Sequence, residues 1–257
     1  MSIIISSIYF SPVKSISFQK IKKCQIKKNM GIINDRLFAF SRLLESKKAY
    51  IMEKDPKARK LINFLSLKNT PPINKYEFEL NNEKLELFEN KKKIISINPN
   101  NPNEISLIEK KILNLDKLIK GPIFLLKNNK YPFFDTTTAG EVMNSISLIN
   151  YNSIKDFEEK IGEKIEYQRF RSNFYIKGLP AWKEREWVGK VISVNGLLFK
   201  VLENIPRCSA TNLKPKSDIM TFNLPKMLKK IYNHIDLGVY ISPLEDGEVI
   251  TGDKIKF

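Results

Sequence analysis

The sequence predicts a mostly β protein with a few helices, an α+β chain built on barrel-like sheets. Short β-branched and aromatic runs recur along its 257 residues, separated by proline, glycine and asparagine. Two pairs of runs flank Asn81-Asn82 and Asn195-Gly196, which are hairpin signatures. Helical spacing of apolar residues is confined to a few short stretches. A chain of this length can bury one large β-rich domain or two smaller ones.

The first elements are read as strands separated by turns. Residues 3–10 are β-branched and aromatic, and Ser11-Pro12-Val13-Lys14-Ser15 ends this strand because proline cannot donate to a ladder. A weak alternation over residues 21–28 predicts a second strand. Asp35-Arg36 then leads into a further strand at residues 37–40.

Helices and a hairpin follow before the middle of the chain. Asp55-Pro56 is typical of a helix start, and it predicts a short helix over residues 57–65. Residues 76–80 and 84–88 alternate in period two and predict a hairpin. Near-helical spacing predicts an amphipathic helix that ends near Gly121-Pro122 and carries Ile105, Ile108, Ile112 and Leu115. We therefore expect an N-terminal domain over residues 1–120 and a second domain over residues 121–257.

The second half is again dominated by strands. Asn152 or Ser153 is expected to cap a helix, because acidic residues follow in its first turns. The clearest prediction is a hairpin of residues 191–194 and 197–201 around Asn195-Gly196. A basic helix is expected at residues 224–234. The remaining strands are predicted at residues 123–126, 145–150, 174–176, 238–241 and 249–257.

The charge raises the possibility of a nucleic-acid-binding protein. Lysine and arginine total 44 against 28 acidic residues, which gives a net charge of +16. The excess is mostly lysine, whereas base readout relies on arginine, so a solvated surface that attracts anions is favoured. No apolar run reaches the roughly 18 to 20 residues that span a bilayer. The first residues lack a basic leader, and we expect a cytoplasmic protein.

Few residues are available for metal or nucleophilic chemistry. Two distant cysteines give neither zinc spacing nor a disulfide framework, and the single His234 excludes a histidine cage. A triad using His234 has no nucleophile-elbow motif to join. Cys24, in a weakly alternating strand, is expected to be a packing or surface residue.

Cys208 has two readings. Free cysteines are often buried small hydrophobes without chemistry. Here, however, Arg207 can stabilise a thiolate, Pro206 stiffens the approach, and Thr211 offers a short polar side chain. A thiolate also suits a soft or intermediate transition metal. The predicted hairpin delivers this loop at the end of its second strand.

Taken together, five short motifs resemble a MOSC-domain protein with the β-barrel domain that commonly precedes it. Their order and spacing cover nearly the full length. The motifs are Ser11-Pro12-Val13-Lys14-Ser15, Gly31 with Asp35-Arg36, Arg169-Phe170-Arg171-Ser172-Asn173, Arg207-Cys208-Ser209-Ala210-Thr211, and Leu237-Gly238-Val239-Tyr240 followed by Gly247 and Gly252-Asp253.

The resemblance implies a molybdenum cofactor. In that family the cysteine matching Cys208 is the protein ligand to molybdenum in molybdenum–molybdopterin, and Arg207 would help to hold it deprotonated. The resemblance implies that the cofactor's phosphate and pterin edges, which need basic and hydrogen-bonding groups, are bound by Lys14, Ser15, Arg36, Arg171, Asn173, Arg207 and Thr211. Without the resemblance, Arg36 and Arg171 would be read as ion-paired residues and Lys14 as a surface amine.

The same resemblance implies an activity. Amidoxime-reducing-component-like members reduce N-hydroxylated compounds in two-electron steps, with a small-molecule substrate. Electrons would come from a separate donor protein, because only Cys24 would remain for an iron–sulfur cluster. Asn150 aligns loosely with a polar residue on the substrate side. Pyridoxal phosphate binding is a further association of the family alone.

Two departures and two alternatives accompany the resemblance. Pro206 stands where the better-known reductases carry a serine that touches the cofactor, and Lys214 stands where aspartate is usual. A cofactor carrier or sulfur-handling module without substrate turnover would use the same binding residues. A nucleic-acid-binding protein has only the net charge in its favour.

Overall fold

A computed structural model describes residues 2–16, 18–134 and 144–257 of the chain. The strands are β1 (Ile3–Phe10), β2 (Gln19–Ile21), β3 (Lys23–Lys27), β4 (Gly31–Ile32), β5 (Phe38–Arg42), β6 (Tyr76–Asn81), β7 (Lys84–Glu89), β8 (Lys92–Ile97), β9 (Ile123–Lys127), β10 (Ile146–Asn150), β11 (Phe174–Lys177), β12 (Val191–Val194), β13 (Leu197–Pro206), β14 (Asp236–Pro243), β15 (Gly247–Ile250) and β16 (Lys254–Lys256).

Among the described residues, the helices are fewer than the strands. They are α1 (Ser46–Lys54), α2 (Pro102–Leu113), α3 (Tyr151–Ile161) and α4 (Leu224–Tyr232), with 3₁₀ turns η1 (Pro56–Ala58), η2 (Leu61–Asn63), η3 (Pro71–Lys75), η5 (Tyr167–Phe170), η6 (Lys183–Trp187) and η7 (Ser209–Asn212). The predicted mostly β class with a few helices is confirmed in the described residues. None of their helices is long and apolar enough to cross a bilayer.

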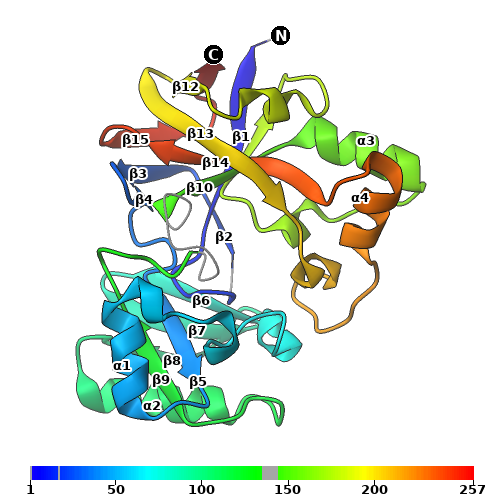
Figure 1. Ribbon diagram of the computed structural model, residues 1–257. Coiled ribbons are helices and arrows are strands. Elements are labelled where there is room, and N and C mark those ends of the chain that lie inside the picture. Colours follow the sequence, from blue (N-terminus) through cyan, green and yellow to red (C-terminus); the bar gives the residue numbers. More distant parts are fainter. Residues whose placement is uncertain (1, 17, 135–143) are drawn as a thin grey trace.

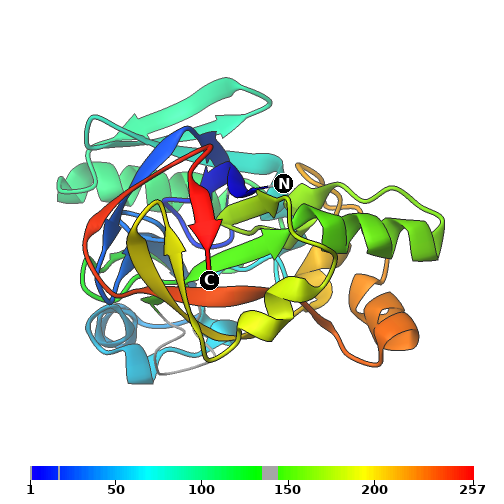
Figure 2. The same cartoon turned by 90° about the horizontal axis from the view of Figure 1, so that it is seen from above.

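One sheet closes into a seven-stranded barrel (Figures 1 and 2). Its strands follow the order β11-β10-β14-β13-β12-β16-β1, and β1 pairs back onto β11 to complete the ring. The β10–β11 pair is parallel and the other pairs of the ring are antiparallel. Closure leaves the strands of the ring paired on both sides, which removes edges open to other chains.

The barrel interior is filled by alternate side chains of its strands. Ile5 of β1, Phe199 of β13 and Ile241 of β14 are fully buried in one apolar cluster. Within β13, Phe199 and Val201 are buried and Lys200 between them is exposed, because the pleat turns successive side chains to opposite faces. The first strand of the chain therefore supplies part of the core of a barrel whose other strands come from residues 146–256.

A second layer lies at the opposite end of the molecule from α3 (Figure 1). It contains the antiparallel sheet β6-β7-β8, the β5–β9 pair and helices α1 and α2. Ile108 and Ile112 of α2 are buried in a cluster with Phe78 and Leu87 of the sheet. The near-helical spacing that predicted this helix is thus the spacing of its buried face. The predicted end near Gly121-Pro122 is wrong, because the helix ends at Leu113 and Leu115 lies beyond it.

Strand pairing crosses the boundary expected at residue 120. β1 pairs with β11 and β16, and β3 pairs with β15 of the second half. In the other direction, β9 pairs with β5. The two halves are interleaved, and the division at 120/121 stays a prediction.

Both predicted hairpins are confirmed, as β6–β7 and β12–β13. The helix expected over residues 57–65 is wrong, since only the three-residue turns η1 and η2 form there. Asp55 does cap the first turn by accepting from the Lys57 amide. Beyond it, Phe64 and Leu65 are buried, and the Leu65 amide donates to the Phe40 carbonyl at 2.9 Å. Tertiary pairing with β5 has therefore overridden the local helix signal.

Two smaller predictions also need correction. The cap of α3 is Asn150, whose side-chain oxygen accepts from the Asn152 amide, and not Asn152 or Ser153. The strand expected over residues 249–257 is two strands, β15 and β16, separated by a turn at Gly252-Asp253. The Asp253 side chain accepts from the Ile250 amide at 2.8 Å and holds that turn.

Gly238 in β14 provides a test of the barrel's packing. Its φ is +81°, and a Cβ added there would lie 2.4 Å from the Leu148 carbonyl oxygen. Gly189 has nearly the same φ, +83°, with nothing within 4 Å of an added Cβ. Alanine at either position incurs about 1–2 kcal/mol for the left-handed backbone, and overpacking at Gly238 adds about 1–3 kcal/mol.

We therefore expect Gly238→Ala to lower the free energy of unfolding by about 2–5 kcal/mol and Gly189→Ala by only about 1–2 kcal/mol. Urea denaturation of both variants measures the difference. Equal losses would contradict the close approach of β14 to β10.

Candidate functional site

Cys208 lies just beyond the end of β13. The strand ends at Pro206, and Cys208 adopts an extended backbone as the residue that precedes η7. Its side chain is exposed. The Thr211 hydroxyl donates to the Cys208 carbonyl at 2.8 Å, and the Thr211 amide donates to the same oxygen at 3.1 Å. Thr211 therefore fixes the backbone from which the thiol projects.

The thiol borders a cavity of about 490 Å³. Seven of the nine residues predicted for the site line it, namely Lys14, Ser15, Arg36, Arg171, Arg207, Cys208 and Thr211. Among the described residues of the wall, the cations are Lys14, Arg36, Lys68, Arg169, Arg171 and Arg207, and the only carboxylate is Glu203. Such a concentration of positive charge in a concave site favours an anionic ligand.

The turn after β1 carries Lys14 and Ser15. The Ser11 hydroxyl lies 2.8 Å from the carbonyl oxygens of both Val13 and Ile16, which holds the turn closed. Lys14 is buried, and its ammonium donates to the carbonyl oxygens of Phe133 and Phe134 at 3.2 and 3.3 Å. The turn thus presents a fixed cation at the cavity wall.

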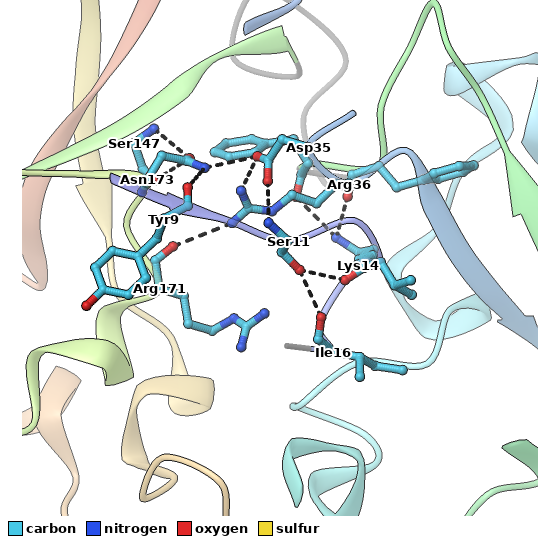
Figure 3. Close-up of polar contacts among 12 residues, drawn as sticks. Tyr9, Ser11, Lys14, Ile16, Asp35, Arg36, Ser147, Arg171 and Asn173 are labelled. Atoms are coloured by element: carbon cyan, nitrogen blue, oxygen red, sulfur yellow. Dashed lines mark hydrogen bonds and ion pairs between the residues drawn. The ribbon is translucent and has the colours of Figure 1, made fainter. Parts of the chain in front are cut away.

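Asp35, Arg36 and Asn173 form one buried network behind that wall (Figure 3). The Asp35 carboxylate accepts from the Ser11 amide at 2.8 Å, from the Asn173 side chain at 3.0 Å and from the Arg36 guanidinium. Asn173 also accepts from Ser147 and donates to the Tyr9 carbonyl. Asn173 does not line the cavity; it orients Asp35, and through Asp35 it orients Arg36.

Arg171 lies beside Arg36 from a different element. The carbon atoms of both guanidinium groups are 5.3 Å from the centre of the Phe18 ring, a cation–π arrangement. Burial, and then the charge of Arg36, lower the pKa of Arg171 to about 10. An anion bound beside the two guanidiniums would offset both effects.

Three of the predicted ligand-binding residues have a left-handed backbone. The φ angles are +64° at Ser15, +52° at Arg36 and +52° at Arg171. Such angles are uncommon for residues other than glycine, and they cluster where structure is constrained for function. Their coincidence at one cavity is an independent sign that this wall is a site.

Arg207 and Arg169 differ from Arg36 and Arg171 because their guanidinium groups hold backbone segments together. The Arg207 guanidinium donates to the carbonyl oxygens of Leu237 and Phe170, and burial lowers its pKa. Arg169 donates to the Asn212 carbonyl at 2.9 Å, to Thr221 and to Glu166. These contacts tie the Cys208 loop to η5 and β14, while the charges remain at the cavity.

Sequence reasoning missed the part of the wall that lies between α1 and β6 in the chain. This part consists of Leu61, Ser66, Leu67 and Lys68. The Ser66 hydroxyl is buried without a hydrogen-bond partner in the described structure, which leaves a polar atom beside the cavity unsatisfied. No motif marks this segment, because its position depends on the pairing of Phe64 with β5.

Asn150 is not brought to the cavity. It is fully buried at the end of β10, and its side chain donates to the carbonyl oxygens of Leu179 and Pro180 at 3.2 and 2.8 Å and to Glu184 at 3.3 Å. These donations anchor the segment that leads into η6, while the side-chain oxygen of Asn150 caps α3 by accepting from the Asn152 amide. The suggested substrate-side role of Asn150 has no support from this geometry.

The Glu184 carboxyl beside Asn150 makes stability depend on pH. It is fully buried, and burial raises its pKa above the ordinary 4.5 although Ser153, the Glu184 backbone amide and Asn150 donate to it. Between pH 4.5 and the raised value, the folded chain holds a proton that the unfolded chain has lost. The contribution of Glu184 to stability therefore falls as pH rises through this window.

We expect the free energy of unfolding of Glu184→Gln to rise relative to that of the parent protein between pH 4 and pH 7, because glutamine keeps the shape and cannot ionise. Urea unfolding of both proteins at each pH isolates this group, since the other titrating residues cancel in the difference. A difference in stability that does not change with pH would contradict the assignment.

The two cysteines differ sharply in their surroundings. Cys24 is buried in the barrel core, and burial raises its pKa to about 12, so it stays a thiol. Cys208 is exposed beside basic groups, where a thiolate can bind a soft metal. No cluster of three or more His, Cys, Asp or Glu side chains exists in the described residues. A metal held at this cavity would rely on Cys208 and on ligands that the bound group brings with it.

Comparison with known proteins finds a matching family model and a curated relative. Residues 135–256 match the family model of the MOSC domain. Mitochondrial amidoxime reducing component 2 from Rattus norvegicus is 25% identical over 122 residues, which are 43% of this chain and 36% of that protein. The chain thus spans about a third of the length of this curated relative.

Solved structures with similar folds include two bacterial proteins. The YuaD protein from Bacillus subtilis has a TM-score of 0.45 at 12% identity, covering 99% of this chain and 94% of that one. YiiM from Geobacillus stearothermophilus has a TM-score of 0.35 at 19% identity, covering 43% of this chain and 52% of that one. The sequence match shows that this chain carries a MOSC domain over residues 135–256.

Proposed function

We propose that the cavity beside Cys208 binds molybdenum–molybdopterin and that the loaded protein reduces N-oxygenated small molecules. The observation that carries the proposal is the position of an exposed thiol on a cavity whose described wall residues include six cations and one carboxylate. MOSC domains are associated with this cofactor, and the matched relative bears the name of an amidoxime reducing component. The donor set therefore fits the group that the family implies.

Each residue would have a distinct task toward the cofactor. Cys208 would be the thiolate ligand to the metal, on a backbone fixed by Thr211. Arg36 and Arg171 would hold the dianionic phosphate with Lys14 and Ser15, since charge-assisted hydrogen bonds from fixed donors are the strong ones. Asn173 would act through Asp35 by keeping Arg36 in place. Pro206 has no side-chain donor, so the contact that a serine would make there has to come from elsewhere.

The bound cofactor would supply the two-electron redox chemistry. The chain would orient it, with Leu61, Ser66, Leu67 and Lys68 as further wall residues of the same cavity. Pyridoxal phosphate is not proposed as a ligand, because the ammonium of Lys14, the buried lysine of this cavity, is directed at two backbone carbonyl oxygens.

A cofactor carrier or sulfur-handling module is the second candidate. The exposure of Cys208 favours it, because a thiol that must exchange a group with another protein has to be accessible. Both candidates predict a bound cofactor. Only the first predicts turnover of a substrate.

The test is to produce the protein in cells that make the cofactor and to measure molybdenum and pterin per chain. Benzamidoxime reduction with a viologen as chemical reductant then separates the candidates. Bound cofactor with no turnover across a panel of N-hydroxylated compounds would favour the carrier. Protein without either metal or pterin after cofactor supply would overturn both.

A further inference from the structure

Five aromatic rings form a packed column between the surface and the Cys208 cavity. Tyr151 stacks on Tyr175 with ring centres 5.2 Å apart, Tyr175 meets Tyr9 at 5.6 Å, and Tyr9 stacks on Phe18 at 5.2 Å. Tyr167 contacts both Tyr151 and Tyr175 at 5.1 Å. The rings thus lie within ordinary aromatic contact at every step.

The inner end of the column reaches the proposed cofactor site. Phe18 lies against the guanidinium groups of Arg36 and Arg171, which line the Cys208 cavity. Tyr9 and Tyr175 in the middle of the column are buried. The Tyr9 and Tyr167 hydroxyls are 2.9 Å apart, and the Tyr175 hydroxyl donates to the Tyr167 carbonyl, so the polar atoms of the column are paired.

The outer end opens on a second cavity of about 850 Å³ beside α3. Tyr151 and Tyr167 line it together with Lys20, Lys155 and Lys177, all three of which are exposed. No carboxylate is present among the described residues of its wall, and none of the three lysines forms an ion pair within the described structure. Lys177 instead lies over the Tyr151 ring at 5.4 Å.

We propose that this basic face, which we call the α3 face and define by Lys20, Lys155 and Lys177 around Tyr151 and Tyr167, is the docking surface of an acidic protein that donates one electron at a time. The inference rests on the proposed function, since it supplies the electrons for that reaction. Each of two donor molecules passes one electron through the aromatic column to the Cys208 cavity. The N-hydroxylated substrate takes up these two electrons and two protons, its N–O bond breaks, and water leaves.

The aromatic column and the three lysines together distinguish the α3 face from other lysine-rich parts of the surface. Electrons tunnel better across packed atoms than across gaps, and the column is a continuous packed route to the site. The mouth of the Cys208 cavity must also admit the substrate, so a donor bound elsewhere does not compete with it. Burial raises the pKa of Tyr9 and of Tyr175, which keeps the middle of the column uncharged.

The first test measures binding without turnover. The probe is an oxidised acidic flavodoxin, titrated calorimetrically at low and at physiological ionic strength. The triple variant Lys20→Glu, Lys155→Glu and Lys177→Glu is compared with a control that reverses Lys84, Lys92 and Lys111. The control lysines are exposed, make no ion pair in the described structure and lie on β7, β8 and α2 (Figure 1). Both triples change the net charge equally.

We expect the α3-face triple to weaken binding by about tenfold or more at low salt, and the control by less than about twofold. Equal weakening in the two triples would overturn the docking surface, because it would report net charge alone. Binding that does not respond to salt would overturn it as well.

The second test measures electron delivery in the loaded protein. Reduction of benzamidoxime is followed with reduced flavodoxin and, separately, with the viologen, using Tyr167→Leu and the ring-keeping control Tyr167→Phe. We expect Tyr167→Leu and the α3-face triple to slow only the flavodoxin-driven rate, by severalfold, and Tyr167→Phe to leave both rates unchanged.

Comparing flavodoxin with the viologen distinguishes failure of the proposed function from failure of the docking inference. Absence of turnover with the viologen in the parent protein would overturn the proposed function and the docking inference with it. Normal turnover with the viologen, together with equal flavodoxin rates in all variants, would overturn the docking inference alone.

Discussion

Cys208→Ala is expected to release molybdenum from the loaded protein and to abolish amidoxime reduction. Loss of groups that merely support a metal ligand already lowers affinity or activity by roughly 10- to 100-fold, so loss of the ligand itself should exceed about 100-fold. The measurement is metal and pterin content per chain, followed by turnover with a chemical reductant. The exposed position of the thiol makes a folding defect an inadequate explanation.

Cys24→Ala is the matched control. It removes the second thiol of the chain from the barrel core, where burial raises the pKa to about 12. We expect it to lower stability through lost packing and to leave the metal content unchanged. One molybdenum per chain in Cys208→Ala, or metal lost only in Cys24→Ala, would contradict the assignment of the ligand.

Elements stabilised by local signals were predictable from the sequence. The β12–β13 hairpin follows from Asn195-Gly196, where Asn195 and Gly196 both have the positive φ of a tight turn. The same reasoning predicted β6–β7 around Asn81-Asn82, and the two turn residues are Asn82 and Glu83, since Asn81 pairs with Lys84. In contrast, residues 57–65 carry a helix start whose continuation is prevented by pairing with β5, and such long-range pairing leaves no local pattern.

The residues of the candidate site also divide into those that local motifs predict and those that only long-range packing brings to the cavity. Short motifs predicted Lys14, Arg36, Arg171 and Cys208, and the fold brings them to one cavity. Their roles toward a cofactor stay predictions. Ser66 and Lys68 could not be predicted, since they reach the cavity only through the packing of the second layer on the barrel loops.

Asp35→Ala is expected to cost about 3–5 kcal/mol of unfolding free energy, the range for breaking one side of a buried ion pair. The carboxylate accepts from the Ser11 amide, the Asn173 side chain and the Arg36 guanidinium, and Asp35 and Arg36 are 5% and 7% exposed. Its removal leaves the Arg36 charge buried without its carboxylate. Thermal or urea unfolding measures the loss.

The exposed pair of Asp218 and Lys75, 2.6 Å apart, provides the comparison, because solvated ion pairs contribute at most about 1 kcal/mol. Asp218→Ala should therefore be nearly neutral. The double variant Asp35→Ala, Arg36→Met removes both buried charges, and it should be more stable than Asp35→Ala alone. A double variant less stable than the single one would mean that Arg36 stabilises this wall through contacts other than Asp35. In that case the network would not be the device that holds the guanidinium at the cavity.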